Sequence, residues 1–275
     1  MISKYLETII KFIIADTRRV GIGIASVLGF GKPGTGKTYF MEKSLAPAFL
    51  QGQGEVIFYQ CHEGTGKEEL LYDLDIRGIV EKLSGSSSAF LNYIQEGVIL
   101  KALKQSQKQK ILLILDEIDK SRPAVDGFLL DILQNGRVYD PAFGMVEGNT
   151  ANLIFAFTSN DERQLSEALL RRPRKIQFQF PSHEDELKIL REMGVKVSDR
   201  FIKFLITVAN YYRDQEVIKS VSSYELARIC FDLEVETDIN DFLYWFSPYR
   251  EDQEIILKKF PRDYLFGMLK GAFHE

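Results

Sequence analysis

The stretch that decides the fold is Gly31-Lys32-Pro33-Gly34-Thr35-Gly36-Lys37-Thr38. It follows an apolar run, residues 22–30, that predicts a buried strand, and it fits the pattern G-x-x-x-x-G-K-[ST] at every fixed position. Glycines let backbone N–H groups curl round an anion, and a helix that begins at the lysine directs its positive dipole end to the same place. Lys37 is placed to reach the outer phosphates of a nucleoside triphosphate, and the Thr38 hydroxyl to bind Mg²⁺. The predicted nucleotide site comprises Gly31, Pro33, Gly34, Thr35, Gly36, Lys37 and Thr38.

An acidic pair supplies the second half of this site. The continuous apolar run 111–115 predicts a strand buried on both faces of a parallel sheet, and Asp116 and Glu117 follow it directly. By itself, an acidic pair at a strand end is usually a solvated turn. Beside a phosphate-binding loop, however, Asp116 fits the Mg²⁺ ligand, and Glu117 is placed to polarise the water that attacks the γ-phosphate. The pair therefore indicates hydrolysis of ATP as well as binding.

Two later segments extend the pattern. Asn160 follows the apolar run 153–157, so we expect it beside the attacking water, where it would sense the γ-phosphate; the alternative is an asparagine that only favours a turn. Arg171 and Arg172 follow a predicted helix. The alternative for this pair is a solvated basic face, but in this context an arginine supplied by a neighbouring subunit would stabilise charge in the transition state.

The remaining patterns predict the domain organisation. Strands are expected at 22–30, 55–59, 111–115, 153–157 and 176–180, a hairpin over 136–148, and helices at 38–46, 64–79, 93–109 and 123–134. Strands that alternate with helices predict an α/β fold with a parallel sheet. Beyond Pro181 only helices are expected, at 183–193, 199–212, 222–231 and 238–246, with an amphipathic helix over 264–273. The predicted domains are an N-terminal helix (1–19), an α/β nucleotide-binding domain (20–181) and a helical lid (182–275).

The composition is that of an ordinary globular protein, with 45% hydrophobic and 27% charged residues. A formal net charge of −4 excludes a global attraction to nucleic acid or anionic membranes. The two cysteines, Cys61 and Cys230, lack the spacing of metal ligands and are expected to be reduced and half-buried. Without a cleavage signal or a long apolar span, we expect a cytoplasmic protein with no membrane partner.

Taken together and in this order, GKPGTGKT, LLILDEIDK, FTSN and ALLRR resemble the AAA+ ATPases. Within that family the chain is most similar to the MoxR-like, dynein-related branch. The segments that carry this finer resemblance are 61–65, 69–71, 96–102 and 129–137. The P-loop NTPase fold of this family is an AAA+ core followed by a small all-helical lid.

The resemblance implies a homo-oligomeric ring, usually a hexamer, that binds ATP and Mg²⁺ at subunit interfaces. One subunit would supply Lys37, Thr38, Asp116, Glu117 and Asn160. Its neighbour would supply Arg172 as the finger, or alternatively Arg171. The family architecture also implies that residues 61–90 lie near a central pore, with the loop 84–88 meeting the substrate.

One departure concerns the lid. The family commonly has a second sensor arginine near the start of a lid helix, but here Tyr224 takes that position. Arg228 lies one turn further along the same helix face and would be the replacement contact with the nucleotide. The alternative is a lid that lacks this contact, with weaker coupling between nucleotide state and lid angle.

The predicted function is an ATPase that couples hydrolysis to remodelling of a client. A protein client is expected because the overall charge is acidic. Two alternatives stay open: a DNA-associated motor or loader of the same ATPase type, with basic residues presented locally, and a nucleotide-dependent scaffold that does not hydrolyse ATP.

Overall fold

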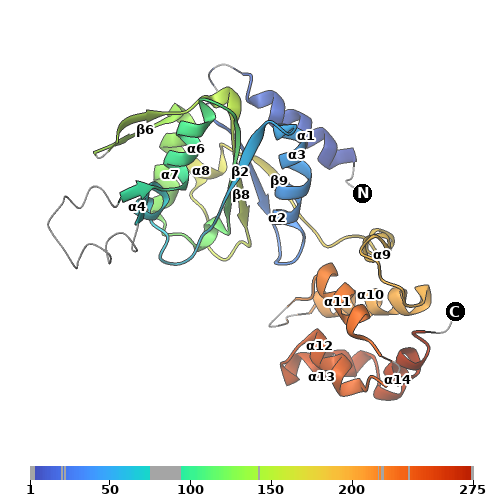
Figure 1. Ribbon diagram of the computed structural model, residues 1–275. Coiled ribbons are helices and arrows are strands. Elements are labelled where there is room, and N and C mark those ends of the chain that lie inside the picture. The colour runs from blue at the N-terminus through green and yellow to red at the C-terminus, as the bar shows by residue number, and fades with distance from the viewer. Residues whose placement is uncertain are drawn as a thin grey trace, which may run out of the picture. The chain divides into compact units, whose positions relative to one another are not determined.

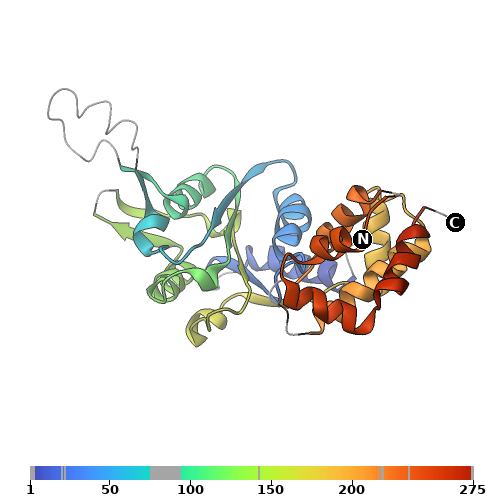
Figure 2. The same ribbon diagram turned by 90° about the horizontal axis from the view of Figure 1, so that it is seen from below.

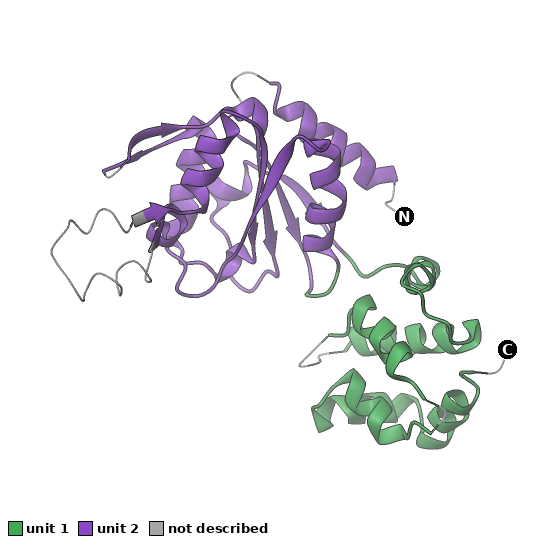
Figure 3. Ribbon diagram, in the orientation of Figure 1, with its two compact units in different colours: residues 1, 33–35, 179–275 green, residues 2–32, 36–178 purple. Residues whose placement is uncertain are grey.

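A computed structural model describes residues 4–19, 21, 23–74, 94–141, 143–215, 217, 220–234 and 236–273. The chain forms two compact units (Figure 3). The α/β unit contains residues 2–32 and 36–178, and the helical unit contains residues 1, 33–35 and 179–275. The domain bounds drawn from the sequence, 20–181 and 182–275, stay a prediction. No helix in the described part of the chain is both long and apolar enough to cross a bilayer.

A five-stranded parallel sheet forms the centre of the α/β unit, in the order β2-β5-β8-β1-β9. The bounds are β1 Ala25–Phe30, β2 Gly54–Gln60, β5 Lys110–Asp116, β8 Leu153–Ser159 and β9 Arg174–Gln177. The apolar runs therefore predicted the central strands correctly, and the α/β fold is confirmed. Every residue of β8 and all but the first of β5 are buried, as expected for strands covered on both faces.

Helices cover both faces of the sheet (Figure 1). On one face lie α1 (Lys4–Asp16) and a continuous helical stretch formed by α2 (Lys37–Phe40), a π-helical turn (Met41–Leu45) and α3 (Ala46–Leu50). On the other face lie α4 (Lys67–Leu71), α6 (Val98–Ser106), α7 (Ala124–Asn135) and α8 (Glu167–Leu170). The predicted hairpin forms from β6 (Arg137–Asp140) and β7 (Gly144–Glu147).

Two predicted helices are wrong in part. Within the predicted helix 64–79, the chain forms the short α4 and then β3 (Tyr72–Leu74), and residues 75–79 lie outside the described residues. Instead of a helix beginning at residue 93, β4 (Ile94–Glu96) pairs antiparallel with β3 before α6 begins. The pairing joins segments about twenty residues apart, so helical periodicity within each segment could not reveal it. The predicted substrate loop 84–88 lies outside the described residues.

The N-terminal helix α1 is attached to the sheet by an ion pair. The carboxylate of Asp16 accepts hydrogen bonds from Nε and Nη2 of Arg174, at the start of β9. Arg19 donates to the same carboxylate at 3.0 Å. Ile10 and Ile13 are buried against the side of the sheet that α3 covers. The helix is thus packed on the α/β unit.

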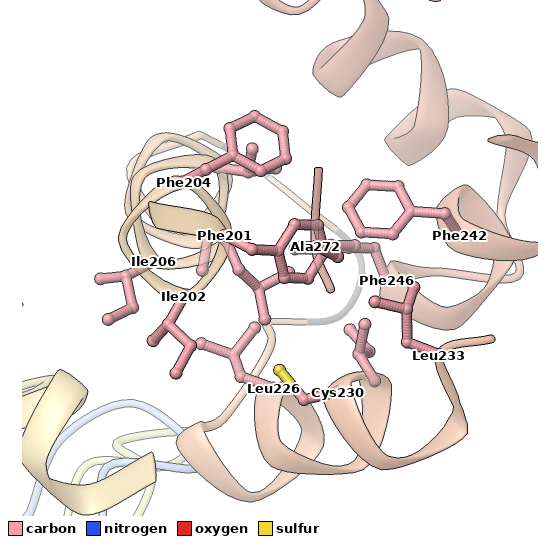
Figure 4. Close-up of a cluster of buried hydrophobic side chains, with 14 of the residues drawn as sticks. Phe201, Ile202, Phe204, Ile206, Leu226, Cys230, Leu233, Phe242, Phe246 and Ala272 are labelled. Atoms are coloured by element: carbon pink, nitrogen blue, oxygen red, sulfur yellow. The ribbon is translucent and has the colours of Figure 1, made fainter. Parts of the chain in front are cut away.

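The described residues of the helical unit form six helices: α9 (His183–Glu192), α10 (Asp199–Arg213), α11 (Ser223–Asp232), α12 (Ile239–Phe246), α13 (Arg250–Lys259) and α14 (Arg262–Lys270). Figure 2 shows them, coloured orange to red, gathered in one bundle. Its core contains Phe201, Leu226, Phe242 and Phe246 (Figure 4). The sequence predicted five of these helices but not α13, whose charged residues outnumber its apolar ones. Both cysteines are free and buried, one in each unit.

Candidate functional site

The candidate site lies at the carboxyl ends of four neighbouring parallel strands, β2, β5, β8 and β1. In parallel sheets this edge collects the loops that follow the strands, and it is where ligands bind in open α/β folds. The register pairs Gln60 of β2 with Asp116 of β5, and Phe30 of β1 with Ser159 of β8. Residues far apart in the sequence are therefore brought to one edge.

The loop after β1 depends on glycine. Gly31 has a φ of +141°, and a Cβ there would lie 2.3 Å from the carbonyl oxygen of Phe178. Gly36, with a φ of +89°, precedes the first residue of α2. Gly34 also has a positive φ, of +79°. A residue with a side chain would adopt each of these three conformations unfavourably. The loop after β1 therefore contains three positions whose backbone conformation favours glycine.

Lys37 is almost fully buried, with 6% of its surface exposed. Its Nζ donates to the carbonyl oxygens of Gly31 at 2.7 Å and Lys32 at 3.0 Å. A third hydrogen bond, of 2.8 Å, joins Nζ to Oδ1 of Asn160. The lysine thus connects the loop after β1 with the residue that follows β8.

Asp116, at the tip of β5, joins the same edge. Its Oδ1 accepts hydrogen bonds from the hydroxyls of Thr38 and Thr158, both at 2.7 Å. The Thr158 hydroxyl in turn accepts the backbone N–H of Glu117 at 2.8 Å. A hydroxyl and a carboxylate this close supply the oxygen ligands that Mg²⁺ prefers. No cluster of three or more His, Cys, Asp or Glu with metal-ligand geometry occurs among the residues that the structure describes.

Glu117 has a φ of +54°, in the left-handed region, where a residue with a side chain is unfavourable and often functional. Oε1 accepts a hydrogen bond of 3.0 Å from the side-chain amide of Asn160. Oε2 accepts from Lys120 at 2.9 Å and from Gln60 at 3.2 Å. Asn160 thereby bridges the ammonium of Lys37 and the carboxylate of Glu117.

The surroundings shift the pKa values of both charged groups. Burial lowers the pKa of Lys37, and the carboxylates of Asp116 and Asp119 offset this only in part. Burial by itself would raise the pKa of Glu117. Hydrogen bonds from Lys120 and Gln60, with a smaller contribution from Asn160, outweigh that penalty and lower the Glu117 pKa. Glu117 is therefore ionised at neutral pH.

A known domain family matches this chain. Residues 26–173, just over half of the chain, match the AAA domain of the dynein-related subfamily. The chain belongs to the AAA+ ATPase family. The match contains Lys37, Asp116 and Asn160.

Several curated proteins are similar to this AAA+ chain. It is 30% identical over 137 residues to the chaperone protein ClpB of Mycoplasma pneumoniae, covering 50% of this chain and 17% of ClpB. Over 232 residues it is 25% identical to the chloroplastic chaperone protein ClpC2 of Oryza sativa, covering 80% of this chain and 23% of ClpC2. The chain therefore spans less than a quarter of the length of these relatives. A solved structure of an ATPase candidate from Cytophaga hutchinsonii has 16% identity and a TM-score of 0.46, covering 91% of this chain and 79% of that one.

The predicted arginines of this AAA+ chain are divided between the two units, with Arg171 and Arg172 in the α/β unit and Arg228 in the helical unit. Arg171 and Arg172 are exposed just beyond α8, and Arg171 forms an exposed ion pair of 3.3 Å with Glu167. Arg228 and Tyr224 are exposed on α11, and Arg228 lies 3.6 Å from Asp232. Within the described residues of the α/β unit, neither Arg171 nor Arg172 forms a hydrogen bond to Lys37, Thr38, Asp116, Glu117 or Asn160.

Sequence reasoning missed three members of this AAA+ site, namely Gln60, Lys120 and Thr158. Gln60 is the last residue of β2 and Thr158 the next to last of β8, so each follows an apolar run as Asp116 does. A polar residue at the end of a predicted strand was the available signal. It could be used only with the strand order, which places β2 and β8 on either side of β5.

Proposed function

We propose that this chain is an ATP-hydrolysing module that assembles into a homo-oligomeric ring, a hexamer by family resemblance, and couples hydrolysis to the remodelling of a client protein. The observation that carries the proposal is the hydrogen-bonded chain from Lys37 through Asn160 to Glu117, beside the paired oxygens of Thr38 and Asp116. Membership of the AAA+ family supports the use of ATP. The similarity to proteins named Clp chaperones supports a protein client.

In this proposal the loop after β1 binds the phosphates. The Lys37 ammonium exchanges its bonds to the carbonyl oxygens of Gly31 and Lys32 for phosphate oxygens of ATP. Thr38 and Asp116 would hold Mg²⁺, which offsets the negative charge on the β- and γ-phosphates. Two hydrogen bonds from the ammonium to neutral carbonyl oxygens are thus replaced by bonds to charged phosphate oxygens, which are stronger because both partners carry charge.

Glu117 acts on the attacking water. Its ionised carboxylate can accept a hydrogen bond from the water, orient it and receive its proton as the bond to phosphorus forms. Asn160 holds the carboxylate from one side, and Lys120 and Gln60 hold it from the other. Arg172, or alternatively Arg171, would supply positive charge from a neighbouring subunit, for which its exposure leaves it accessible.

Turnover assays test the enzyme. Glu117→Gln should bind ATP and lose hydrolysis by at least a hundredfold, because the amide cannot accept the proton of the water. Lys37→Ala should lose both binding and turnover. Glu184→Gln, the same exchange at an exposed position of α9, is the matched control and should behave as wild type. Wild-type protein that hydrolyses no ATP at high concentration would favour the nucleotide-dependent scaffold.

A mixing experiment tests the shared site. Arg172→Ala and Lys37→Ala proteins, each inactive alone, should recover part of the turnover when combined, because some interfaces then unite an intact loop with an intact arginine. Sedimentation with ATP verifies that both variants assemble. Assembly without recovery would contradict an arginine supplied in trans.

The client class is tested by stimulation. Reduced and carboxymethylated α-lactalbumin, a permanently unfolded protein, should raise the turnover of the wild type more than double-stranded DNA does. Stimulation by DNA that declines steeply with salt would instead support the DNA-associated motor.

A further inference from the structure

Asp119 is a buried carboxylate close to the candidate site, with only 2% of its surface exposed. It lies on the short 3-10 helix Ile118–Lys120 that follows β5. Its Oδ2 accepts two backbone hydrogen bonds, from the N–H of Asn160 at 3.0 Å and from the N–H of Glu162 at 2.9 Å. A single carboxylate oxygen of Asp119, which follows β5, therefore accepts hydrogen bonds from both sides of the turn after β8.

That turn is held in an unfavourable conformation. Asp161, between the two N–H donors, has a φ of +62°, in the left-handed region that favours glycine. Backbone N–H groups on either side of such a residue converge into a concave nest for an anion. Here the anion is the Asp119 carboxylate, so its two hydrogen bonds offset the cost of the turn and fix the backbone of Asn160.

A second contact ties the turn to the same segment. Arg163 donates from Nε to the carbonyl oxygen of Asp119 at 3.2 Å, and its guanidinium forms an ion pair of 2.9 Å with Asp126 of α7. The turn 160–163 is thus attached to the segment after β5 through the backbone of Asp119 as well as through its carboxylate.

The side chain of Asn160 depends on this backbone. Its amide must lie within hydrogen-bond distance of both Lys37 and Glu117, which come from opposite sides of the site. A short side chain allows little adjustment, so a shift of its backbone by about 1 Å would break one of the two bonds. The charge of Asp119 is also near enough to raise the pKa of Lys37 against the effect of burial.

We infer that Asp119 is a positioning residue for ATP hydrolysis, which holds the backbone turn of Asn160 so that its amide bridges Lys37 and Glu117. This inference rests on the proposed ATPase function. It assigns Asp119 a task that differs from those of the adjacent acids Asp116 and Glu117, because its bonded oxygen contacts backbone N–H groups of the protein.

A double-mutant cycle tests the inference. Asp119→Ala and Asn160→Ala should each lower kcat by about ten- to a hundredfold, the range expected when a reacting group is misplaced by about 1 Å. The double variant should be no more than about twofold slower than Asn160→Ala, because Asp119 acts through Asn160. Asp119→Asn should retain kcat within about fivefold, since its amide oxygen can accept the same two N–H groups.

Two further measurements separate positioning from folding. The affinity for fluorescent ADP, which lacks the γ-phosphate, should stay within about twofold of wild type in Asp119→Ala, whereas a collapsed site would lose it. Asp131→Ala, an exposed acid of α7, is the matched control and should leave kcat unchanged. If Asp119→Ala does not fold, Asp119→Ser takes its place in the cycle. Asp119→Asn remains the variant that is expected to retain kcat.

The outcomes distinguish the inference from the proposed function. Normal kcat in a folded Asp119→Ala protein, while Asn160→Ala is impaired, overturns the inference and leaves the ATPase intact. The inference is also overturned if Asp119→Ala lowers kcat by the same factor in the Asn160→Ala background as in the wild type, because Asp119 would then act independently of Asn160. Absence of turnover in the wild type overturns both.

Discussion

The buried ion pair between Arg213 and Glu186 gives a sharp prediction for the helical unit. Glu186 has no exposed surface and Arg213 has 3%. Two hydrogen bonds, of 2.7 and 2.8 Å, join the guanidinium to the carboxylate. Arg213 also donates to the carbonyl oxygen of Val221 at 2.8 Å and lies over the ring of Phe180, 4.1 Å from its centroid. The pair joins the C-terminal end of α10 to α9.

Replacing Arg213 by Met leaves the carboxylate of Glu186 buried without its cation. Removing one partner of a buried ion pair typically costs about 3–5 kcal/mol. We therefore expect Arg213→Met to lower the free energy of unfolding by about 3–5 kcal/mol at pH 7.

A second substitution tests the pair from the other side. Because isolated buried pairs are often replaceable by apolar residues, adding Glu186→Leu should recover at least half of the loss.

Urea unfolding followed by tryptophan fluorescence measures this deficit. Trp245, the single tryptophan of the chain, packs against the core of the helical unit and reports on that unit. Arg228→Met is the control, because its ion pair with Asp232 is exposed and should contribute less than about 1 kcal/mol. A loss below about 1 kcal/mol for Arg213→Met, or no recovery when Glu186→Leu is added, would refute the reasoning.

Three further predictions concern single contacts. Thr158→Val keeps the shape of a buried side chain but removes the hydroxyl that joins β5 to β8. In urea titrations it should lower the free energy of unfolding by about 1–3 kcal/mol, and it should reduce ATP turnover at least tenfold. Asp16→Asn weakens the ion pair with Arg174, so the α/β unit should lose about 1–2 kcal/mol and α1 should become more sensitive to limited proteolysis. Burial raises the pKa of the Cys61 and Cys230 thiols to about 12, so both should react with a thiol reagent at pH 8 at least a hundredfold more slowly in native protein than in urea.

The sequence predicted the parts of this molecule that local patterns determine. The runs 111–115 and 153–157 are apolar at every position, and both are central strands of the sheet. The spacing of the loop 31–38 and the acidic pair after β5 identified the residues that the structure brings together. Each of these signals lies within ten residues of sequence.

The prediction failed where the structure depends on contacts between distant segments. β3 is three residues long and gains its stability by pairing with β4, so its own residues carried no clear strand signal. Gln60 and Thr158 reach Glu117 only because β2 and β8 lie on the two sides of β5. Asp119 was recognised only as part of an acidic motif, since its two backbone partners follow a different strand.

The bridge made by Asn160 has a direction. Its oxygen meets the ammonium of Lys37 and its nitrogen meets the carboxylate of Glu117, and the planar amide holds the two a fixed distance apart. Rotating the amide by half a turn would set an NH₂ group against a cation and an oxygen against an anion. Aspartate in this position would repel Glu117, and serine would be too short to span the gap. Asn160 therefore fits only a cation beside its oxygen and an anion beside its nitrogen. A ligand that binds Lys37 in place of Asn160 would leave the asparagine oxygen free to accept a hydrogen bond from another donor.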